Sequence, residues 1–187
     1  MFRWVINHLW GKPQKKIWEN KALKWDSVLP IAMQNTWNDI KNDLEKLKDI
    51  YFPRKVCDDN ETCTLNIFVD ASIECYSFCA YLTDSRKISR LIFSKAKVSP
   101  KNKTIPQLEL LSIFLSLKCL PLILDSYKNF TNVQIWGDSQ IALQWVLEGS
   151  KGKNMFVKNR IKDINDIKEK LGKSNNLKFQ HFYKIGR

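Results

Sequence analysis

The stretch Val133-Gln134-Ile135-Trp136-Gly137-Asp138-Ser139-Gln140 contains a change from strand to helix that decides the fold of this chain. Residues 133 to 138 alternate between two faces, which is the period of a β-strand. Ser139 is a suitable N-cap for a helix over Gln140–Glu148, whose apolar side chains can pack on a sheet. Asp138 is therefore predicted at the C-terminal edge of a strand, where open α/β sheets bind ligands.

A second predicted strand, Leu65–Asp70, also ends in an aspartate. If this strand lies parallel and adjacent to the first, Asp70 and Asp138 meet at one edge of the sheet. Two further strands, Tyr76–Leu82 and Leu91–Lys97, follow after short links, which predicts an antiparallel meander. The sequence thus predicts three antiparallel strands before the strand that ends at Asp138.

Between the meander and that strand, Pro106 begins a strongly apolar helix that reaches about Leu124. Its leucines cover nearly the whole circumference, so we expect burial on more than one side. The exceptions form a narrow polar stripe, namely Glu109, Ser112, Ser116 and Cys119. We place Glu109 in the first turn, where the helix dipole favours a carboxylate, although decoration of the helix end alone would also explain a glutamate there.

A helix over Met155–Leu171 and a last strand from Leu177 to Tyr183 complete the series. The order β-β-β-α-β-α-α-β predicts an α/β fold with a mixed five-stranded sheet and flanking helices, in which two helical crossovers produce parallel strands. The helix that carries Glu109 can then bring its N-terminal end to the edge that holds the two aspartates.

The N-terminal part differs in character. We expect short helical pieces up to Trp25 and one amphipathic helix over roughly Pro30–Ile50, with an apolar stripe that must be buried against something. Pro53–Glu61 is polar and turn-like, and is interpreted as a linker. The predicted division is a helical segment over residues 1–56 and an α/β domain over residues 57–187.

The charge of +12 in 187 residues favours a polyanionic partner, although lysine-rich solvated helix faces would produce the same total. The net charge is +5 over residues 1–56, −1 over residues 57–150 and +8 over residues 151–187. The segment with both strand-end aspartates is therefore nearly neutral between two basic flanks. This distribution suits an acidic metal site within a surface that attracts phosphates.

The cysteines are odd in number and include no C-x-x-C pair, and Cys75 and Cys79 are expected to behave as small hydrophobic residues. Neither His8 nor His181 has a partner at the spacing of zinc ligands. The N-terminus lacks the apolar run of a signal peptide, and no apolar run reaches the roughly 20 residues of a membrane span. We expect an intracellular protein, cytoplasmic or nuclear, that is reduced and not secreted.

Five blocks in this order resemble a known family: Ile-Phe-Val-Asp70-Ala-Ser, Ser94-Lys-Ala-Lys-Val-Ser-Pro, Thr104-Ile-Pro-Gln-Leu-Glu109-Leu, Ile135-Trp-Gly-Asp138-Ser and Val157-Lys-Asn-Arg160-Ile. They are similar to the ribonuclease H domain of BEL/Pao-type long-terminal-repeat retrotransposon polyproteins. Upstream, Leu23-Lys-Trp-Asp-Ser-Val-Leu-Pro and Tyr51-Phe-Pro-Arg resemble the segment that joins reverse transcriptase to ribonuclease H. The resemblance covers most of the chain.

The resemblance implies a ribonuclease H-like fold and cutting of the RNA strand of RNA–DNA hybrids with two Mg²⁺ or Mn²⁺ ions. The family's first three metal-binding, catalytic carboxylates correspond to Asp70, Glu109 and Asp138. Two metal ions can stabilise both the attacking and the leaving oxygen of a phosphodiester, and Mg²⁺ prefers oxygen ligands. Candidate contacts to the substrate are Ser72, Lys95, Lys97, Lys101, Lys103, Ser139 and Arg160. For the two serines capping is an alternative role, and for the lysines simple solvation is.

The family has a fourth carboxylate soon after the final strand, whereas this chain stops at Tyr183-Lys-Ile-Gly-Arg187. We therefore expect a domain truncated at its C-terminus, with impaired cleavage. Two functions stay open: a metal-dependent ribonuclease, and a catalytically inactive remnant that binds nucleic acid. A scaffold built on the helix over 30–50 is a more distant third. The expected partners are nucleic acid and the remainder of a retrotransposon polyprotein, with no membrane.

Overall fold

The computed structural model describes residues 23–24, 26–46, 48, 56, 62–127, 130–149, 151–172 and 176–182. These residues form four helices and five strands. By its internal contacts the chain divides into two compact units, Met1–Arg54 and Lys55–Arg187. The predicted helical pieces before Trp25 and nearly all of the predicted linker lie outside the described residues.

In the first unit, helix α3 spans Ile31–Glu45 and begins directly after Pro30, whose carbonyl accepts hydrogen bonds from the backbone N–H groups of Met33 and Gln34. The start agrees with the prediction, since proline tolerates a position at a helix N-terminus. Of the expected apolar stripe, Ile40 is buried, whereas Trp37 is 58% exposed. The helix ends at Glu45 with Lys46 as its C-cap, so it is shorter than the helix predicted to reach about Ile50.

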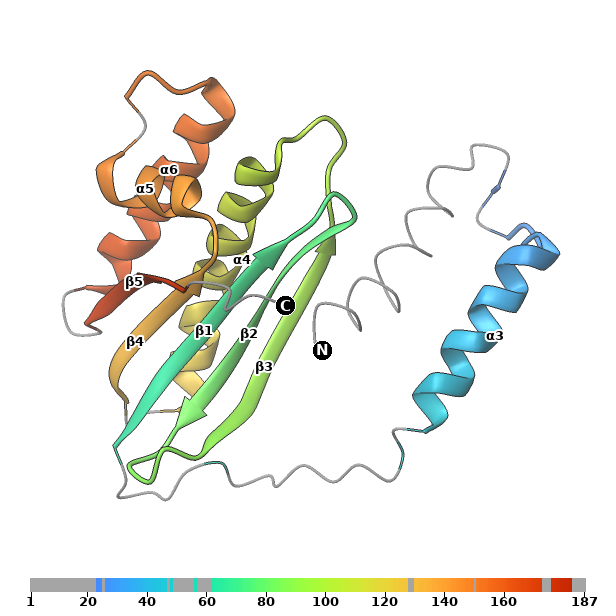
Figure 1. The fold of residues 1–187 in the computed structure, drawn as a ribbon, viewed down its shortest axis with the longest axis horizontal. Helices are drawn as coiled ribbons and strands as arrows, with labels where there is room; N and C mark the ends of the chain where they lie inside the picture. Colours follow the sequence, from blue (N-terminus) through green and yellow to red (C-terminus); the bar gives the residue numbers. More distant parts are fainter. Residues whose placement is uncertain are drawn as a thin grey trace. The chain divides into compact units, whose positions relative to one another are not determined.

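The second unit is built on one five-stranded sheet with the order β3-β2-β1-β4-β5 (Figure 1). Strands β1 (Cys63–Ala71), β2 (Cys75–Thr83) and β3 (Ser89–Val98) form the antiparallel meander. Strands β4 (Phe130–Gly137) and β5 (Leu177–His181) are parallel to β1. The predicted mixed sheet, with three antiparallel strands and two crossovers, is confirmed.

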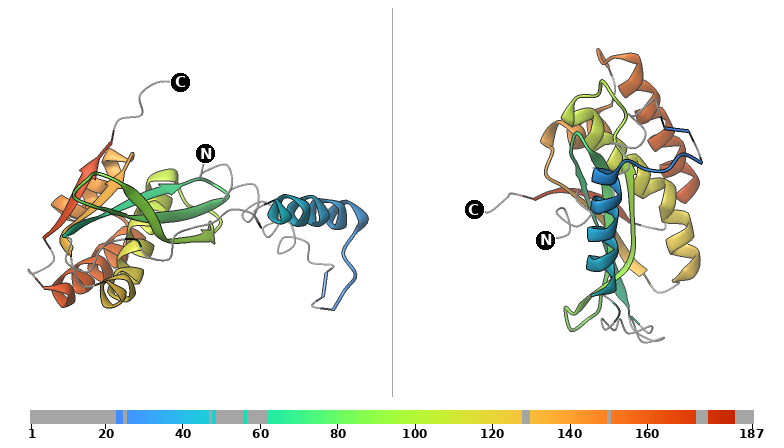
Figure 2. Two further views of the ribbon diagram at one scale, coloured as in Figure 1. Left: turned by 90° about the horizontal axis from the view of Figure 1, so that it is seen from below. Right: turned by 90° about the vertical axis from the view of Figure 1, so that its right-hand side faces the viewer.

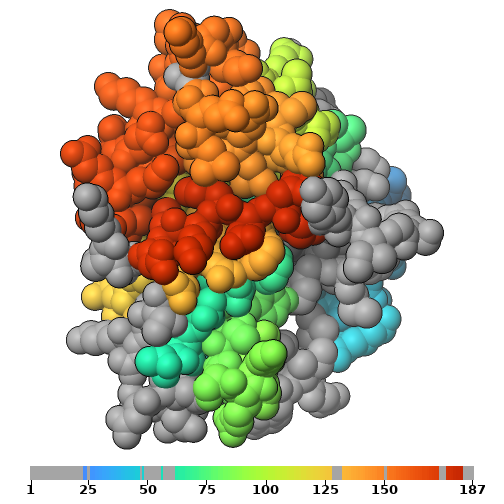
Figure 3. All heavy atoms as spheres, turned by 60° about the vertical axis from the view of Figure 1, so that its left-hand side comes forward, coloured from blue at the N-terminus to red at the C-terminus, as the bar shows by residue number. Residues whose placement is uncertain are grey.

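Three helices accompany this sheet, namely α4 (Ile105–Ser126), α5 (Gln140–Glu148) and α6 (Met155–Leu171). The bounds of α5 and α6 are those predicted, and α4 is longer than predicted by one or two residues at each end. Helices α4 and α6 lie together on one face of the sheet (Figure 2). Strand β5 closes the sheet as an edge strand beside α5 and α6 (Figure 3).

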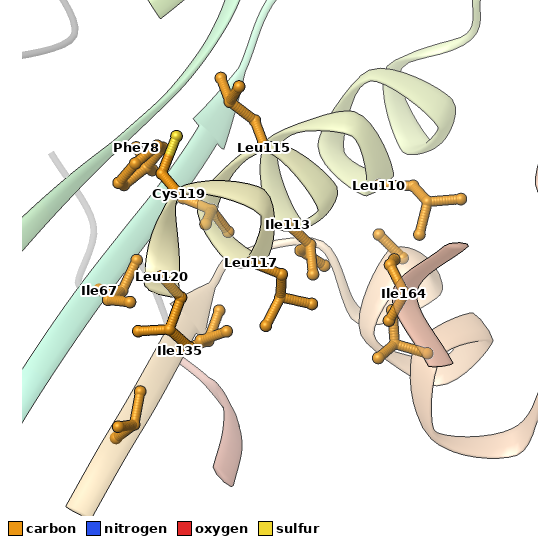
Figure 4. Packing of buried hydrophobic residues seen from close by; sticks show 14 of the residues in the cluster. Ile67, Phe78, Leu110, Ile113, Leu115, Leu117, Cys119, Leu120, Ile135 and Ile164 are labelled. Carbon is orange, nitrogen blue, oxygen red and sulfur yellow. The ribbon is translucent and has the colours of Figure 1, made fainter. Parts of the chain in front are cut away.

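The core lies between this helical layer and the central strands (Figure 4). Ile67 and Ile135 come from β1 and β4, Leu117 and Leu120 from α4, and Ile164 from α6, and all five side chains are 0% exposed. Fully burying such a side chain contributes roughly 1.5–3 kcal/mol. Helix α4 packs against strands as well as helices, so its leucines are buried on more than one side, as the sequence predicts.

By length and composition alone, α4 is long and apolar enough to cross a membrane, in contrast to the prediction that no apolar run reaches that length. However, 72% of its apolar window is buried inside the protein. A helix that is hydrophobic around its circumference is expected at the centre of a core. The burial of α4 therefore explains its composition.

On the opposite face, β1, β2 and β4 carry a row of aromatic side chains. Phe68 makes an edge contact with Tyr81, at 5.9 Å between ring centroids, and stacks on Trp136 at 6.2 Å. Trp136 Nε1 donates to Asn66 Oδ1 at 3.0 Å, so its polar atom is satisfied within the sheet. Side chains of β1 and β4 therefore contact each other on both faces of the sheet, through the aromatic row on this face and through the core on the other.

Candidate metal centre

Asp70 and Asp138 are brought together by the register of two parallel strands. The last registered pair of the β1–β4 ladder is Phe68↔Trp136, and each aspartate lies two residues beyond it on its own chain. The two aspartates are therefore level with each other at the C-terminal edge of neighbouring strands, which are about 4.8 Å apart in a sheet. This juxtaposition follows from the two strand-end aspartates that the sequence shows.

Glu109 reaches the same edge from helix α4. Thr104 is the N-cap, and its backbone N–H donates to Gln107 Oε1 at 3.1 Å, which fixes the start of the helix at Ile105. Glu109 is thus the fifth helical residue, and its predicted place in the first turn is wrong because the helix begins one residue earlier. Its carboxylate is held by the β1 backbone instead: Ala71 N–H donates to Glu109 Oε1 at 3.1 Å.

The three carboxylates form one cluster, with one oxygen of each lying within 4.8 Å of the others. Glu109 is buried, and the two aspartates are half-buried. Two unit charges at this separation repel by roughly 3–4 kcal/mol at an effective dielectric constant of 20. A divalent cation relieves that repulsion and prefers carboxylate oxygens, so the cluster is suited to binding a divalent metal.

Gly137 precedes Asp138 and allows β4 to approach β1 closely. A Cβ atom added at Gly137 would lie 3.2 Å from Val69 Cγ2, which is tighter than an ordinary van der Waals contact. Any larger residue would require either the Val69 side chain or the end of β4 to shift by a few tenths of an ångström. A glycine at this position therefore belongs to the construction of the cluster, not only to the turn.

The end of β5 also contacts this edge, which the sequence analysis missed. His181 Nε2 lies 3.2 Å from the backbone oxygen of Asp138, and Phe182 N–H donates to Gly137 O at 3.2 Å. In the sequence, His181 is a candidate only for a zinc site, and it has no partner there at ligand spacing. The alternation of the last strand, extended by the parallel register Trp136↔Gln180, is the feature that could have placed it here.

The two serines next to the aspartates serve the local backbone. Ser139 Oγ accepts a hydrogen bond from Ala142 N–H at 3.3 Å and caps α5. Ser72 Oγ accepts from the backbone N–H groups of Glu74 and Cys75, each at 3.2 Å, in the β1–β2 turn. These hydrogen bonds support the capping role for Ser139, and for Ser72 a role in holding the β1–β2 turn.

The basic loop that follows β3 is anchored at the edge of the cluster. Ser99 Oγ donates to Ser72 O at 2.8 Å, and Ser99 N–H donates to Glu74 O at 2.9 Å. Lys101 therefore projects from a loop whose base is bound to the turn after Asp70. On β3, exposed Lys97 pairs with Tyr76, which in turn pairs with Ala71, so this lysine is two strands, or about 10 Å, from β1.

Two of the predicted basic contacts lie over aromatic rings of the helical layer. Lys103 Nζ is 4.3 Å from the ring centroid of Phe156, and Arg160 Cζ is 4.8 Å from that of Phe114. Arg160 also forms an ion pair with Asp163 at 3.1 Å. Lys103 and Arg160 therefore take part in packing around α6, in contrast to exposed Lys95, Lys97 and Lys101.

The cysteines near the cluster behave as the sequence predicts. Cys75 and Cys79 are buried free thiols on β2. Burial, and next the negative charge of Asp70, raise the pKa of the Cys79 thiol. It therefore stays protonated at neutral pH and acts as a small apolar residue beside the cluster.

Comparison with known families gives a match to the Pao retrotransposon-like RNaseH-like domain over residues 9–139. The chain belongs to this family. The matched residues include Asp70, Glu109 and Asp138, together with the upstream segment from which the resemblance to a reverse-transcriptase junction was predicted. The chain is therefore a ribonuclease H-like domain of retrotransposon origin. A comparison of the chain with curated proteins finds no match.

Solved structures with the same fold fall into two groups. LC11-RNase H1, isolated from compost by a metagenomic approach and solved in complex with an RNA/DNA hybrid, has a TM-score of 0.50 at 18% identity, covering 64% of this chain and 86% of that chain. The foamy viral protease-reverse transcriptase in complex with dsDNA has a TM-score of 0.61 at 10% identity, covering 94% of this chain. The Pao domain spans only 34% of that viral chain. These likenesses confirm the predicted ribonuclease H-like fold.

Proposed function

We propose that this Pao domain is a metal-dependent nuclease that hydrolyses the RNA strand of RNA–DNA hybrids. The observation that carries the proposal is the convergence of Asp70, Glu109 and Asp138 from two parallel strands and one helix, with oxygens within 4.8 Å of one another. The sequences around these residues are those through which the chain resembles ribonuclease H domains. A structural neighbour, LC11-RNase H1, is described in complex with an RNA/DNA hybrid, which is consistent with this substrate.

The donor set fits Mg²⁺ or Mn²⁺, because all three side chains offer carboxylate oxygens and none offers nitrogen or sulfur. Asp70 and Asp138 would hold the ions from the strand ends, and Glu109 from the helix. Bound divalent ions would supply charge stabilisation to the attacking and leaving oxygens of the phosphodiester. The role of the chain is to keep the three carboxylates in place before the ions arrive.

The substrate would be held mainly through its backbone. An A-form hybrid is recognised by contacts to phosphates and 2′-hydroxyls and by its shape, with little base readout. Lys95, Lys97 and Lys101 are exposed on β3 and on the loop anchored beside Asp70, and Lys103 is partly exposed. These side chains can contact phosphates of a hybrid on the β3 side of the cluster. The remainder of a retrotransposon polyprotein is the proposed covalent context.

The second candidate is a domain that binds the hybrid but does not cut it. It is favoured by the size of the cluster, which contains three carboxylates among the described residues. Asp163, Asp166 and Glu169 lie on α6, and Asp163 is engaged by Arg160. None of them joins the cluster, so one ion would be held less firmly than with a fourth acid.

The test is a cleavage assay on an RNA–DNA hybrid with Mg²⁺ or Mn²⁺, using the chain as it stands, its Asp138→Asn variant and a version extended with an acid-bearing C-terminal helix. Cleavage that Asp138→Asn reduces by on the order of 10²-fold or more supports the nuclease. Cleavage by the extended version alone shows that a fourth acid is required. Hybrid binding without cleavage by either version favours the inactive domain.

A further inference from the structure

The edge of β1 and the start of α4 are joined by two reciprocal hydrogen bonds. Ala71 N–H donates to Glu109 Oε1 at 3.1 Å, and Ser112 Oγ donates to Asp70 O at 2.9 Å. Two adjacent strand residues are thus bonded to two helical residues one turn apart. We call this pair of hydrogen bonds the β1–α4 clamp.

Ser112 is placed for this role by its burial and by its choice of acceptor. Its side chain is 0% exposed, so no water competes for the hydroxyl. Besides Asp70 O, the hydroxyl has Leu108 O at 3.3 Å within its own helix. A hydroxyl carries one proton, and the shorter distance favours the bond to the strand.

We propose that Ser112 is a positioning residue for the metal centre, which acts by fixing the backbone of Asp70 against the helix that carries Glu109. The inference rests on the proposed metal-binding role of the cluster. The three carboxylates lie within 4.8 Å of one another, and a movement of β1 away from α4 would separate Asp70 from Glu109. The clamp opposes that movement, because it joins the backbone of one carboxylate-bearing residue to the turn that bears another.

Helix α4 offers a matched control one turn further on. Ser116 is also 0% exposed, and its hydroxyl donates to Ile113 O at 2.8 Å, within the same helix. Replacing either serine by alanine removes one buried hydroxyl from the same face of α4. Only Ser112→Ala removes a bond to the strand that bears Asp70.

The experiment measures the Mn²⁺ dissociation constant by electron paramagnetic resonance for the wild type, Ser112→Ala and Ser116→Ala, with thermal unfolding of each. Removing groups that orient metal ligands commonly weakens binding 10- to 100-fold. We expect Ser112→Ala to weaken Mn²⁺ binding about tenfold, and Ser116→Ala to leave it unchanged at a similar loss of thermal stability. Equal Mn²⁺ affinity in all three folded proteins would overturn the proposal.

A second readout needs no metal. Amide hydrogen exchange at Ala71 should become faster in Ser112→Ala and stay unchanged in Ser116→Ala, since the clamp protects that N–H. If the wild type binds no Mn²⁺, the proposed function fails while this exchange still decides whether Ser112 holds the strand against the helix. Unchanged exchange at Ala71 in Ser112→Ala would overturn the role of Ser112 whatever the metal result.

Discussion

The two ends of the same sheet each contain a buried or half-buried acid, and they treat it in opposite ways. At the β2–β3 turn, the Asp84 carboxylate is 1% exposed and lies 3.2 Å from Arg86 and 3.4 Å from Arg90, and it accepts a hydrogen bond from Ile88 N–H at 2.8 Å. At the other end, Asp70, Glu109 and Asp138 have one another as near neighbours. The first arrangement neutralises an acid within the protein, and the second concentrates three acids that could bind a divalent metal.

The difference has a consequence for stability. Although burial opposes ionisation of Asp84, the hydrogen bond from Ile88 and the charge of Arg86 hold its pKa below the usual 3.8. Ionised Asp84 therefore stabilises the fold. The carboxylate cluster, by contrast, places three acids within 4.8 Å of one another, an arrangement that could bind a divalent metal. One end of the sheet supports the structure, and the other carries the candidate site.

The largest expected effect is that Mn²⁺ stabilises the folded protein, and that this stabilisation requires Asp138 in the carboxylate cluster but not Asp84 at the β2–β3 turn. Mn²⁺ at 100 times its dissociation constant should stabilise the wild type and Asp84→Asn by about 2.7 kcal/mol, and should leave Asp138→Asn nearly unchanged. Without metal, Asp84→Asn should be less stable than the wild type, because it weakens the hydrogen bond from Ile88 N–H and loses the ion pairs with Arg86 and Arg90. Calorimetric unfolding measures both differences, and equal responses of the two variants would remove the distinction.

The basic loop and β3 should contribute most of the salt dependence of hybrid binding. Replacing Lys95, Lys97, Lys101 and Lys103 together by glutamine should reduce the slope of log K against log salt by as much as ~3.6, since each phosphate contact contributes about 0.9. Lys87→Gln, in the turn beside Asp84, is the control at the opposite end of the sheet and should leave the slope unchanged. A quadruple variant with the wild-type slope would move the contact surface to Lys158, Arg160 and Lys162 on α6.

The close approach of β4 to β1 should be measurable through Gly137. Gly137→Ala places a methyl group 3.2 Å from Val69 Cγ2, so β4 or the valine must shift. We expect Mn²⁺ affinity to fall about fivefold, equivalent to roughly 1 kcal/mol of over-packing. Isothermal titration of Gly137→Ala, and of the same variant combined with Val69→Ala to make room, tests this. Full affinity in Gly137→Ala alone would show that the strand ends tolerate the shift.

The smallest expected effect is confined to acid solution. Because the pKa of Asp84 is lowered on folding, its stabilising contribution is complete above the unfolded value near 3.9 and is lost as the pH falls through the folded value. Between pH 5 and pH 2, the melting temperature of the wild type should therefore fall more steeply than that of Asp84→Asn. Parallel acid profiles would mean that the arginines do not stabilise the ionised form.

Short-range patterns in the sequence are sufficient to locate the strands and helices of the second unit and the three acids. Alternation ending in an acid located Asp70 and Asp138, and an apolar helix with a polar stripe located Glu109 and Ser112. The lengths of the links between strands predict which strands are antiparallel and which are parallel, because short links and helical crossovers allow few topologies. Most boundaries in the second unit differ from the prediction by at most two residues, and α3 ends about five residues early. The shift at the start of α4 makes the predicted first-turn position of Glu109 wrong, because helix ends are set by capping hydrogen bonds that periodicity does not contain.

The tertiary structure alone decided which partner each polar side chain takes. Ser112 could have bonded within its helix, as Ser116 does, and only the approach of α4 to β1 gives it Asp70 O as the nearer acceptor. Arg160 and Lys103 are basic residues in the sequence, but the packing of α6 places them over Phe114 and Phe156. His181 comes to Asp138 through a parallel pairing of strands 43 residues apart. Local sequence specifies what a residue can bond, whereas the distances that choose among partners exist only once distant elements have packed.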